Sequence, residues 1–201
     1  MLKKFIGIAI SLTMAASVLT GCGDKKVDYS ENAEKPEPVH AEYSDGSFNF
    51  DDAMKNTKIA GKTISLPCAL KELGDEFEVD NETPIDGYDY SVFDLSLNGT
   101  EFGKIALENG EEKTKKRIIN NMIFDHNIKG NVSVFGLDTN SSMEDFVEYM
   151  GEPSIKTDVF MEYSDEKGAI AIYFDDTFFK PIIFVFSLIP ENNSTEGQEV
   201  Q

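Results

Sequence analysis

Two stretches of this chain follow the same order of local patterns, and this repetition strongly constrains how the chain can fold. Each stretch begins with a short β-rich segment, continues with an apolar stripe at helical spacing, and ends with three alternating segments separated by turns. The first covers residues 56–128 and the second residues 129–190. The pattern predicts an α+β fold of two tandem units. Each unit is a strand, a helix and a three-stranded antiparallel meander, with the helices packed on one face of the sheet.

The helix of the second unit has the clearest signals. Its apolar residues fall at i, i+3, i+4 and i+7, which is one face of a helix: Met143, Phe146, Val147 and Met150. Ser141 and Glu144 have the spacing of a capping box, and Gly151 stands where a left-handed residue ends many helices. We therefore expect a helix over residues 142–150. Three strands are predicted to follow it, over residues 159–163, 169–174 and 182–189.

The first unit repeats this order with weaker signals. A strand over residues 63–66 precedes Pro67, which suits a first helical position. A helical face is then marked by Leu70, Leu73 and Phe77. After a loop over residues 80–87, we expect strands over 90–97, 102–108 and 117–124. Asn98-Gly99 between the first two strands is a strong signal for a type I′ hairpin turn.

Residues 1–21 have the features of a secretory signal peptide. Lys3 and Lys4 precede an uncharged and mostly apolar run from Phe5 to Val18. This run is too short to cross a bilayer comfortably, because a membrane-spanning helix needs about 20 apolar residues. We expect the segment to be removed during secretion; an uncleaved helix is the alternative.

The signal ends in the residues Leu19, Thr20, Gly21 and Cys22. These four residues resemble the lipobox of bacterial lipoproteins, where small residues precede a cysteine. The resemblance implies cleavage before Cys22, a diacylglycerol thioether on its sulfur, and acylation (such as palmitate) of the new amino terminus. Two acyl chains give stable anchoring at about 0.8 kcal/mol for each buried methylene. This interpretation places the protein on the extracytoplasmic face of the cell membrane; the competing one is a chance cysteine behind an ordinary signal.

The segments on either side of the predicted units are polar. Residues 22–55 combine the predicted lipidated cysteine with few apolar side chains, which is typical of a flexible acidic linker, and residues 191–201 are predicted to be a disordered tail. Near the end of the linker, Phe48 and Phe50 could dock on the folded part, and residues 51–55 could form a helical turn.

The charge and the cysteines limit the classes of partner and of chemistry. The formal net charge is −19, which repels nucleic acid and anionic lipid headgroups, so no nucleic-acid partner is expected. A basic protein patch would be better matched, although simple solubility explains most of these charges. Once Cys22 is lipidated only Cys68 remains, so no disulfide can form within the chain. The apolar neighbours of Cys68 predict that it is a buried structural residue and not a catalytic thiol.

A family resemblance rests on the segment from Gly136 to Ser154, which contains Ser141-Ser142, Glu144-Asp145 and Gly151-Glu152-Pro153. It is similar to a segment of many uncharacterised lipoproteins of Gram-positive bacteria. The unit of short helix, Gly-x-Pro and antiparallel sheet also resembles β-lactamase-inhibitor-like proteins and small outer-membrane assembly lipoproteins. The resemblance implies a binding or scaffolding module and not an enzyme, and it transfers no residue of known function.

Catalytic and cofactor motifs are lacking in the sequence, which has no phosphate loop, zinc-protease helix, Cys-x-x-Cys or Gly-x-Ser-x-Gly. We therefore predict no cofactor, metal or catalytic residue. The acidic pairs Asp51-Asp52, Glu111-Glu112 and Asp175-Asp176 lie in predicted loops and lack the pattern of a calcium loop, although adventitious calcium at the last pair stays open. His126 beside Asp125 is interpreted as a surface pair.

One aromatic pair is a candidate partner contact. Phe178 and Phe179 lie beside the acidic turn Asp175-Asp176 and precede Lys180-Pro181. Adjacent residues in a strand point to opposite faces, so one of the two rings should be exposed, and exposed aromatics ringed by polar groups are typical of binding hot spots. Core packing, or an edge strand ended by Pro181, are the alternatives.

Three functions are compatible with these features. We favour a lipid-anchored binding or scaffolding protein of the bacterial envelope, without catalysis, whose partner is a protein or a cell-wall ligand. The alternative is an inhibitor of a secreted hydrolase that uses the sheet face or Phe178-Phe179. A hydrolase built on loop carboxylates is the least favoured.

Overall fold

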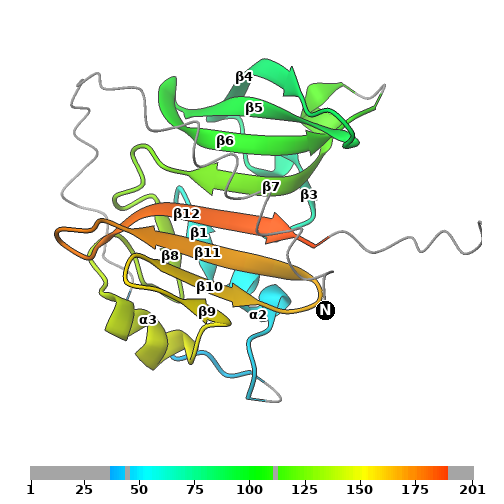
Figure 1. Ribbon diagram of the computed structural model, residues 1–201. Helices are drawn as coiled ribbons and strands as arrows, with labels where there is room; N and C mark the ends of the chain where they lie inside the picture. The colour runs from blue at the N-terminus through cyan, green and yellow to red at the C-terminus, as the bar shows by residue number, and fades with distance from the viewer. Residues whose placement is uncertain (1–36, 44–45, 111–112, 190–201) are drawn as a thin grey trace, which may run out of the picture.

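The computed structural model describes residues 37–43, 46–110 and 113–189. Most of the strand residues belong to one antiparallel sheet (Figure 1). Its strands are, in spatial order, β4 (Phe77–Pro84), β5 (Tyr90–Leu97), β6 (Thr100–Glu108), β7 (Ile118–Phe124), β12 (Pro181–Leu188), β11 (Gly168–Phe174), β10 (Phe160–Ser164) and β9 (Ile155–Lys156). The short strand β3 (Cys68–Ala69) also pairs with β7.

The predicted signal peptide and tail lie outside the described residues. The same holds for the predicted lipobox, which comprises Leu19, Thr20, Gly21 and Cys22.

The predicted α+β class is wrong. The structure is mostly β, with strands making up 44% and helices 13% of it. Within the described residues there are two α-helices, α2 (Phe50–Lys55) and α3 (Met143–Met150). The two meanders do not form separate sheets covered by one helix each. They share one sheet because β7 and β12 pair with each other, with Asn121 opposite Ser187 and Phe124 opposite Phe184.

The helix predicted in the first unit is replaced by a 3₁₀ turn over Leu70–Glu72. Gly74 follows with a φ of 120°, a conformation that interrupts a helix, and Phe77 then begins β4. The apolar side chains at the predicted helical spacing are all buried, so the spacing reports core contacts correctly. A 3₁₀ turn followed by a strand places them there. Strand β4 occupies much of the predicted loop over residues 80–87.

The helix of the second unit is confirmed as α3, but its cap lies one residue further along the chain than predicted. Ser142 is the N-cap: its hydroxyl accepts the main-chain N–H of Asp145, and the Asp145 carboxylate accepts the N–H of Ser142 at 2.6 Å. Gly151 ends the helix with a φ of 82°. The three strands expected after the helix are confirmed as β10, β11 and β12, with ends shifted by one residue.

The predicted hairpin between β5 and β6 is confirmed. Asn98 and Gly99 have φ values of 51° and 73°, and a type I′ turn requires positive φ at both central residues. The β7 strand predicted over residues 117–124 is also present.

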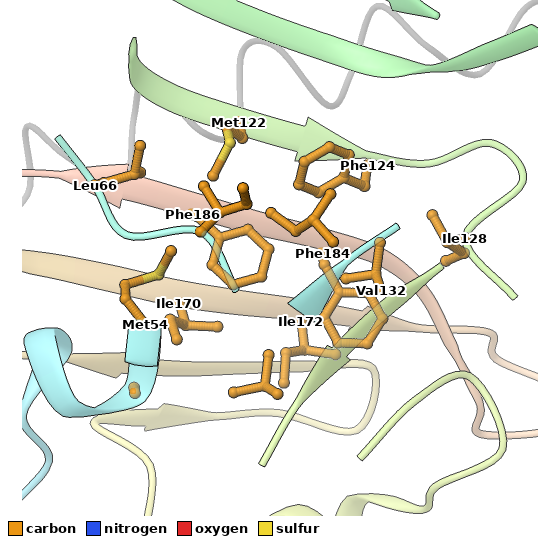
Figure 2. Packing of buried hydrophobic residues seen from close by; sticks show 14 of the residues in the cluster. Met54, Leu66, Met122, Phe124, Ile128, Val132, Ile170, Ile172, Phe184 and Phe186 are labelled. Carbon is orange, nitrogen blue, oxygen red and sulfur yellow. The ribbon is translucent and has the colours of Figure 1, made fainter. Parts of the chain in front are cut away.

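One face of the sheet, here called the inner face, carries the core. It is covered by α2, by α3 and by a small sheet of β2 (Lys62–Thr63), β1 (Thr57–Ile59) and β8 (Val132–Val134). Figure 2 shows the packing between the two layers, where Phe184, Phe186, Ile170 and Ile172 from β12 and β11 meet Met54 and Val132. Phe146 of α3 packs against the same layer, with its ring 5.9 Å from that of Phe174.

Part of the predicted flexible linker is folded. In α2, Phe50 and Met54 are 0% and 1% exposed, and the side chain of Asn49 caps the helix. The arm of residues 37–43 is also fixed: the N–H of Val39 donates to the Phe135 oxygen, and the N–H of Ala41 donates to the Tyr149 oxygen. The docking of Phe48 and Phe50 and the helical turn over residues 51–55, which the sequence allowed, are present, while the flexible linker predicted over residues 22–55 is wrong for residues 37–43 and 46–55.

The opposite face, here called the outer face, carries a second apolar cluster. Ile123, Ala171 and Val185 are its buried members, and they lie opposite one another on β7, β11 and β12. Glu162 on β10 continues this row and is 6% exposed. None of the helices in the described residues is long and apolar enough to cross a bilayer.

Candidate functional site

The turn between β11 and β12 presents the most exposed aromatic side chain among the described residues. Phe178 is 76% exposed and Phe179 is 50% exposed. The prediction that this pair lies within a strand is wrong, because both residues lie in the turn before β12. Neither ring packs in the core, so the partner-contact interpretation is retained over core packing.

The turn is held by main-chain hydrogen bonds to one aspartate. The Asp175 carboxylate accepts the N–H groups of Thr177 and Phe178 at 2.9 and 2.7 Å. The Asp175 N–H donates to the Lys180 oxygen, and the Phe179 N–H donates to the Asp175 oxygen. The backbone beneath the two rings is therefore fixed before any partner arrives.

Phe179 has a backbone conformation that bulky residues avoid. Its φ is 54°, in the left-handed region where glycine and asparagine are favoured. A phenylalanine at this position costs folding free energy, yet its ring gains little burial in return. Strain of this kind is common at sites that contact other molecules.

A second contact fixes the turn to the body of the protein. The ammonium group of Lys180 donates to the main-chain oxygen of Asn140, in the loop that leads into α3. Asn140 is in turn held by Asp138, whose carboxylate accepts the Asn140 N–H at 2.8 Å. Asp138 is only 5% exposed. The turn is thus braced on a buried carboxylate.

Two further apolar side chains are exposed at the same end of the sheet. Val159 is 37% exposed and Ile182 is 43% exposed. The Val159 oxygen accepts the N–H of Phe174. Phe174 lies opposite Pro181, the residue before Ile182, so Val159 and Ile182 flank the turn. We call Val159, Phe178, Phe179 and Ile182 the hairpin tip. It holds four of the six exposed large hydrophobic residues in the described chain. Val159 and Ile182 are not among the predicted partner contacts, because both lie in predicted strands.

The charges around the hairpin tip are mostly negative. Asp158 and Asp176 are exposed and Asp175 is half-buried. Lys180 is engaged with Asn140. The hairpin tip is therefore an apolar patch with an acidic rim.

The acidic pairs considered as metal or catalytic sites have other partners. The Asp175 carboxylate holds the turn, Asp51 pairs with Lys167, and Asp52 pairs with Lys55. Glu111-Glu112 lies outside the described residues. In the part of the chain that the structure describes, no three His, Cys, Asp or Glu side chains gather as a metal site would require.

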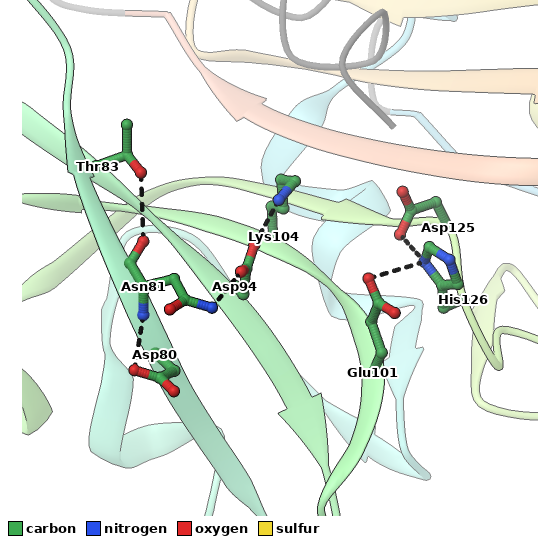
Figure 3. Close-up of polar contacts among 8 residues, drawn as sticks. All are labelled: Asp80, Asn81, Thr83, Asp94, Glu101, Lys104, Asp125 and His126. Atoms are coloured by element: carbon green, nitrogen blue, oxygen red, sulfur yellow. Dashed lines mark hydrogen bonds and ion pairs between the residues drawn. The ribbon is translucent and has the colours of Figure 1, made fainter. Parts of the chain in front are cut away.

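His126 lies at the end of β7, between two carboxylates (Figure 3). Its Nδ1 is 2.8 Å from an Asp125 oxygen and 3.8 Å from a Glu101 oxygen. Nearby, Lys104 on β6 pairs with Asp94 on β5. These contacts tie neighbouring strands together at the surface and stabilise the sheet.

Cys68 is buried at 7% exposure. Burial raises the pKa of its thiol to about 12, and the nearby Glu72 carboxylate adds to the increase. The thiol is therefore protonated at neutral pH, which is the opposite of what a nucleophilic cysteine needs.

A shallow groove of about 490 Å³ lies along the free edge of β4. Phe77 and Phe93 are among its lining residues. The guanidinium of Arg117 lies 5.0 Å from the centre of the Phe93 ring and also pairs with Glu82. These contacts use the arginine for structure, and Lys115, which lines the groove, pairs with Asp75 at 3.1 Å.

Comparisons with protein-family models, with curated proteins and with solved structures found no match. A function must therefore be proposed from the geometry of the hairpin tip and from the sequence features around Cys22.

Proposed function

We propose that this chain is a lipid-anchored, extracytoplasmic binding or scaffolding protein of the bacterial envelope, and that it contacts its partner through the hairpin tip. No catalytic step is part of this proposal. The observation that supports it best is the exposure of Phe178, at 76%, on a turn that is braced at both ends.

Exposure of these rings gives the folded protein little stability in return. Full burial of a phenylalanine side chain contributes about 1.5–3 kcal/mol, and most of that contribution is missing for Phe178. Clustered exposed hydrophobic residues with a polar rim are typical of interaction sites. A pre-ordered turn also reduces the entropy that a partner must overcome on binding.

The anchor is supported by the order of features at the N-terminus: Lys3 and Lys4, the apolar run, and then Leu19-Thr20-Gly21-Cys22. Lipidation at Cys22 would hold the protein at the membrane surface. A partner that is also at this surface would then be met at high effective concentration, without a large docking area.

The anchor is tested by mass spectrometry of the protein purified from the membrane fraction of cells that make the full chain. We expect an N-terminal peptide that begins at a diacylglycerol-modified Cys22. The Cys22→Ala variant should leave the membrane fraction or remain uncleaved. An unmodified Cys22 in a soluble protein, or an intact Met1, would overturn the proposal.

The inhibitor alternative shares the same contact site. A rigid loop with an exposed aromatic side chain can also occupy the cleft of a hydrolase, so the identity of the partner distinguishes the two. Recovery of a secreted hydrolase at the hairpin tip, together with its inhibition by the purified protein, would favour the inhibitor.

A further inference from the structure

The hairpin tip and the point where the N-terminal arm joins the body are linked through one short segment of chain. The arm is bound to Phe135 through the N–H of Val39, at 2.9 Å. It also passes close to Gly136, where an added Cβ would come within 2.4 Å of the Glu37 oxygen. Four residues further along, Asn140 accepts the hydrogen bond from Lys180. The arm of residues 37–43 therefore meets the body beside the loop that braces the turn of the hairpin tip.

This arrangement limits where a partner can be. Glu37 is joined to Cys22 through 14 intervening residues, so the end of the body that carries Glu37 is the end nearest along the chain to the proposed anchor. A binding site at that end faces molecules at the membrane surface more readily than molecules further out.

The charges indicate what kind of molecule fits. The rim of the hairpin tip contains Asp158, Asp175 and Asp176, and the whole chain has a formal net charge of −19. Anionic lipid headgroups would be repelled, and a second copy of this chain would bring like charges together. Lysine or arginine side chains around an apolar pocket would complement both features of the site.

Resting on the proposed function, we propose that the hairpin tip docks on a protein at the surface of the anchoring membrane, one with an apolar pocket rimmed by lysine or arginine. Phe178 enters the pocket, with Phe179, Val159 and Ile182 around it. The rim cations face Asp158 and Asp176, which speeds association and sets the orientation. The lipid bilayer itself is the competing occupant and is distinguished by the test.

The test is photo-crosslinking in cells that make the full, lipidated chain. Phe178 is replaced by p-benzoylphenylalanine, which keeps an aromatic ring at the position. The matched control carries the same residue in place of Tyr88, an aromatic that is 44% exposed in the connection between β4 and β5. Adducts are sequenced by mass spectrometry to identify the crosslinked residue and its surroundings.

We expect one protein adduct at position 178 that is absent at position 88, and a crosslinked residue that lies in an apolar pocket next to lysine or arginine. Its yield should fall at least about fivefold when Asp176→Lys is added, and less with Asp176→Asn, because rim charges act on association. Unchanged circular dichroism of both variants shows that the fold persists.

Several outcomes would overturn the inference. These are a lipid adduct, an adduct with a second copy of the chain, a protein contact without nearby cations, and an equal yield with Asp176→Lys. An adduct yield at position 178 that does not exceed the yield at position 88 would also overturn the inference. The N-terminal mass from the same cells is read separately: if Cys22 is lipidated and no adduct forms, the docking inference fails while the anchor stands.

Discussion

Ile123 on β7 lies directly opposite Val185 on β12, and this pair is the point at which the two meanders become one sheet. Both side chains are 1% exposed. Contacts across this junction are shared by both halves of the chain, so neither half should be stable alone.

We predict that Ile123→Ala lowers the free energy of unfolding by about 2–5 kcal/mol, because it leaves a cavity at the junction. Both meanders should unfold in one cooperative transition in urea, followed by far-UV circular dichroism and by tyrosine fluorescence. Lys156→Ala, an exposed change on the edge strand β9, serves as the control and should have little effect. Two separate transitions would show that the halves are independent.

The hairpin tip should be almost neutral for stability. Phe178→Ala is expected to change the free energy of unfolding by no more than about 0.5 kcal/mol, since the ring is exposed. Phe184→Ala, at a fully buried position on β12, should cost about 3–5 kcal/mol. Phe179→Gly should stabilise the protein by up to about 1 kcal/mol, because glycine adopts positive φ freely. Thermal and urea unfolding measure all three, and a large loss with Phe178→Ala would contradict the site assignment.

Glu162 should make stability depend on pH. Burial raises the pKa of this carboxyl above that of an exposed glutamate. In the pH range between the unfolded and folded pKa values, the folded protein keeps a proton that the unfolded chain releases, so the contribution of Glu162 to stability falls as the pH rises. Glu162→Gln should therefore stabilise the protein at pH 7.5 and have little effect well below pH 4.

The control for this experiment is Glu166→Gln, an exposed neighbour in the turn between β10 and β11. Urea unfolding is measured for both variants at the two pH values. Equal effects of the two substitutions, or destabilisation by Glu162→Gln at pH 7.5, would refute the assignment.

The free edge of β4 is expected to keep the protein monomeric. Glu78 and Asp80 are exposed there, a bulge at Asn81 with φ of 54° breaks the register, and Pro84 lacks an N–H donor. Charges, bulges and prolines of this kind prevent edge-to-edge pairing. The double variant Glu78→Val/Asp80→Val should therefore self-associate, as seen by analytical ultracentrifugation. Glu144→Val/Glu148→Val on α3 makes the same charge change and should associate less.

Cys68 should resist alkylation in the folded protein. In a Cys22→Ser variant it is the remaining thiol, and its pKa of about 12 leaves little thiolate at pH 8. Iodoacetamide should label it only after unfolding in urea, as followed by mass spectrometry. Fast labelling of the folded protein would show that the thiol is accessible and ionised.

The local elements followed closely from the sequence, and their assembly did not. Periodicity located α3, the Asn98-Gly99 turn and six of the strands, because each depends on residues close together in the chain. Alternation fixes which side chains share a face, but it does not determine which strands become neighbours. The pairing of β7 with β12 joins residues 66 apart at Asn121 and Ser187, and no local pattern encodes it.

Two other differences have local causes. The part of β4 from Asp80 to Pro84 was predicted as a loop because it is acidic and exposed, and only Phe77 and Val79 of this strand face the core. At the candidate site, Phe178 and Phe179 were found from their adjacency to an acidic turn. Ile182 was assigned to a regular strand, but the register shifts between Tyr173 and Phe174, and that irregularity lies beside it.

The arm of residues 37–43 limits how far the folded body can lie from Cys22. Because Val39 and Ala41 are bonded to the body, the span between Cys22 and the first fixed contacts near Glu37 has 14 intervening residues. A chain of that length reaches at most about 50 Å when fully stretched. If Cys22 carries lipid, as proposed, the folded body stays within this distance of the lipid surface and cannot reach deep into a thick cell wall.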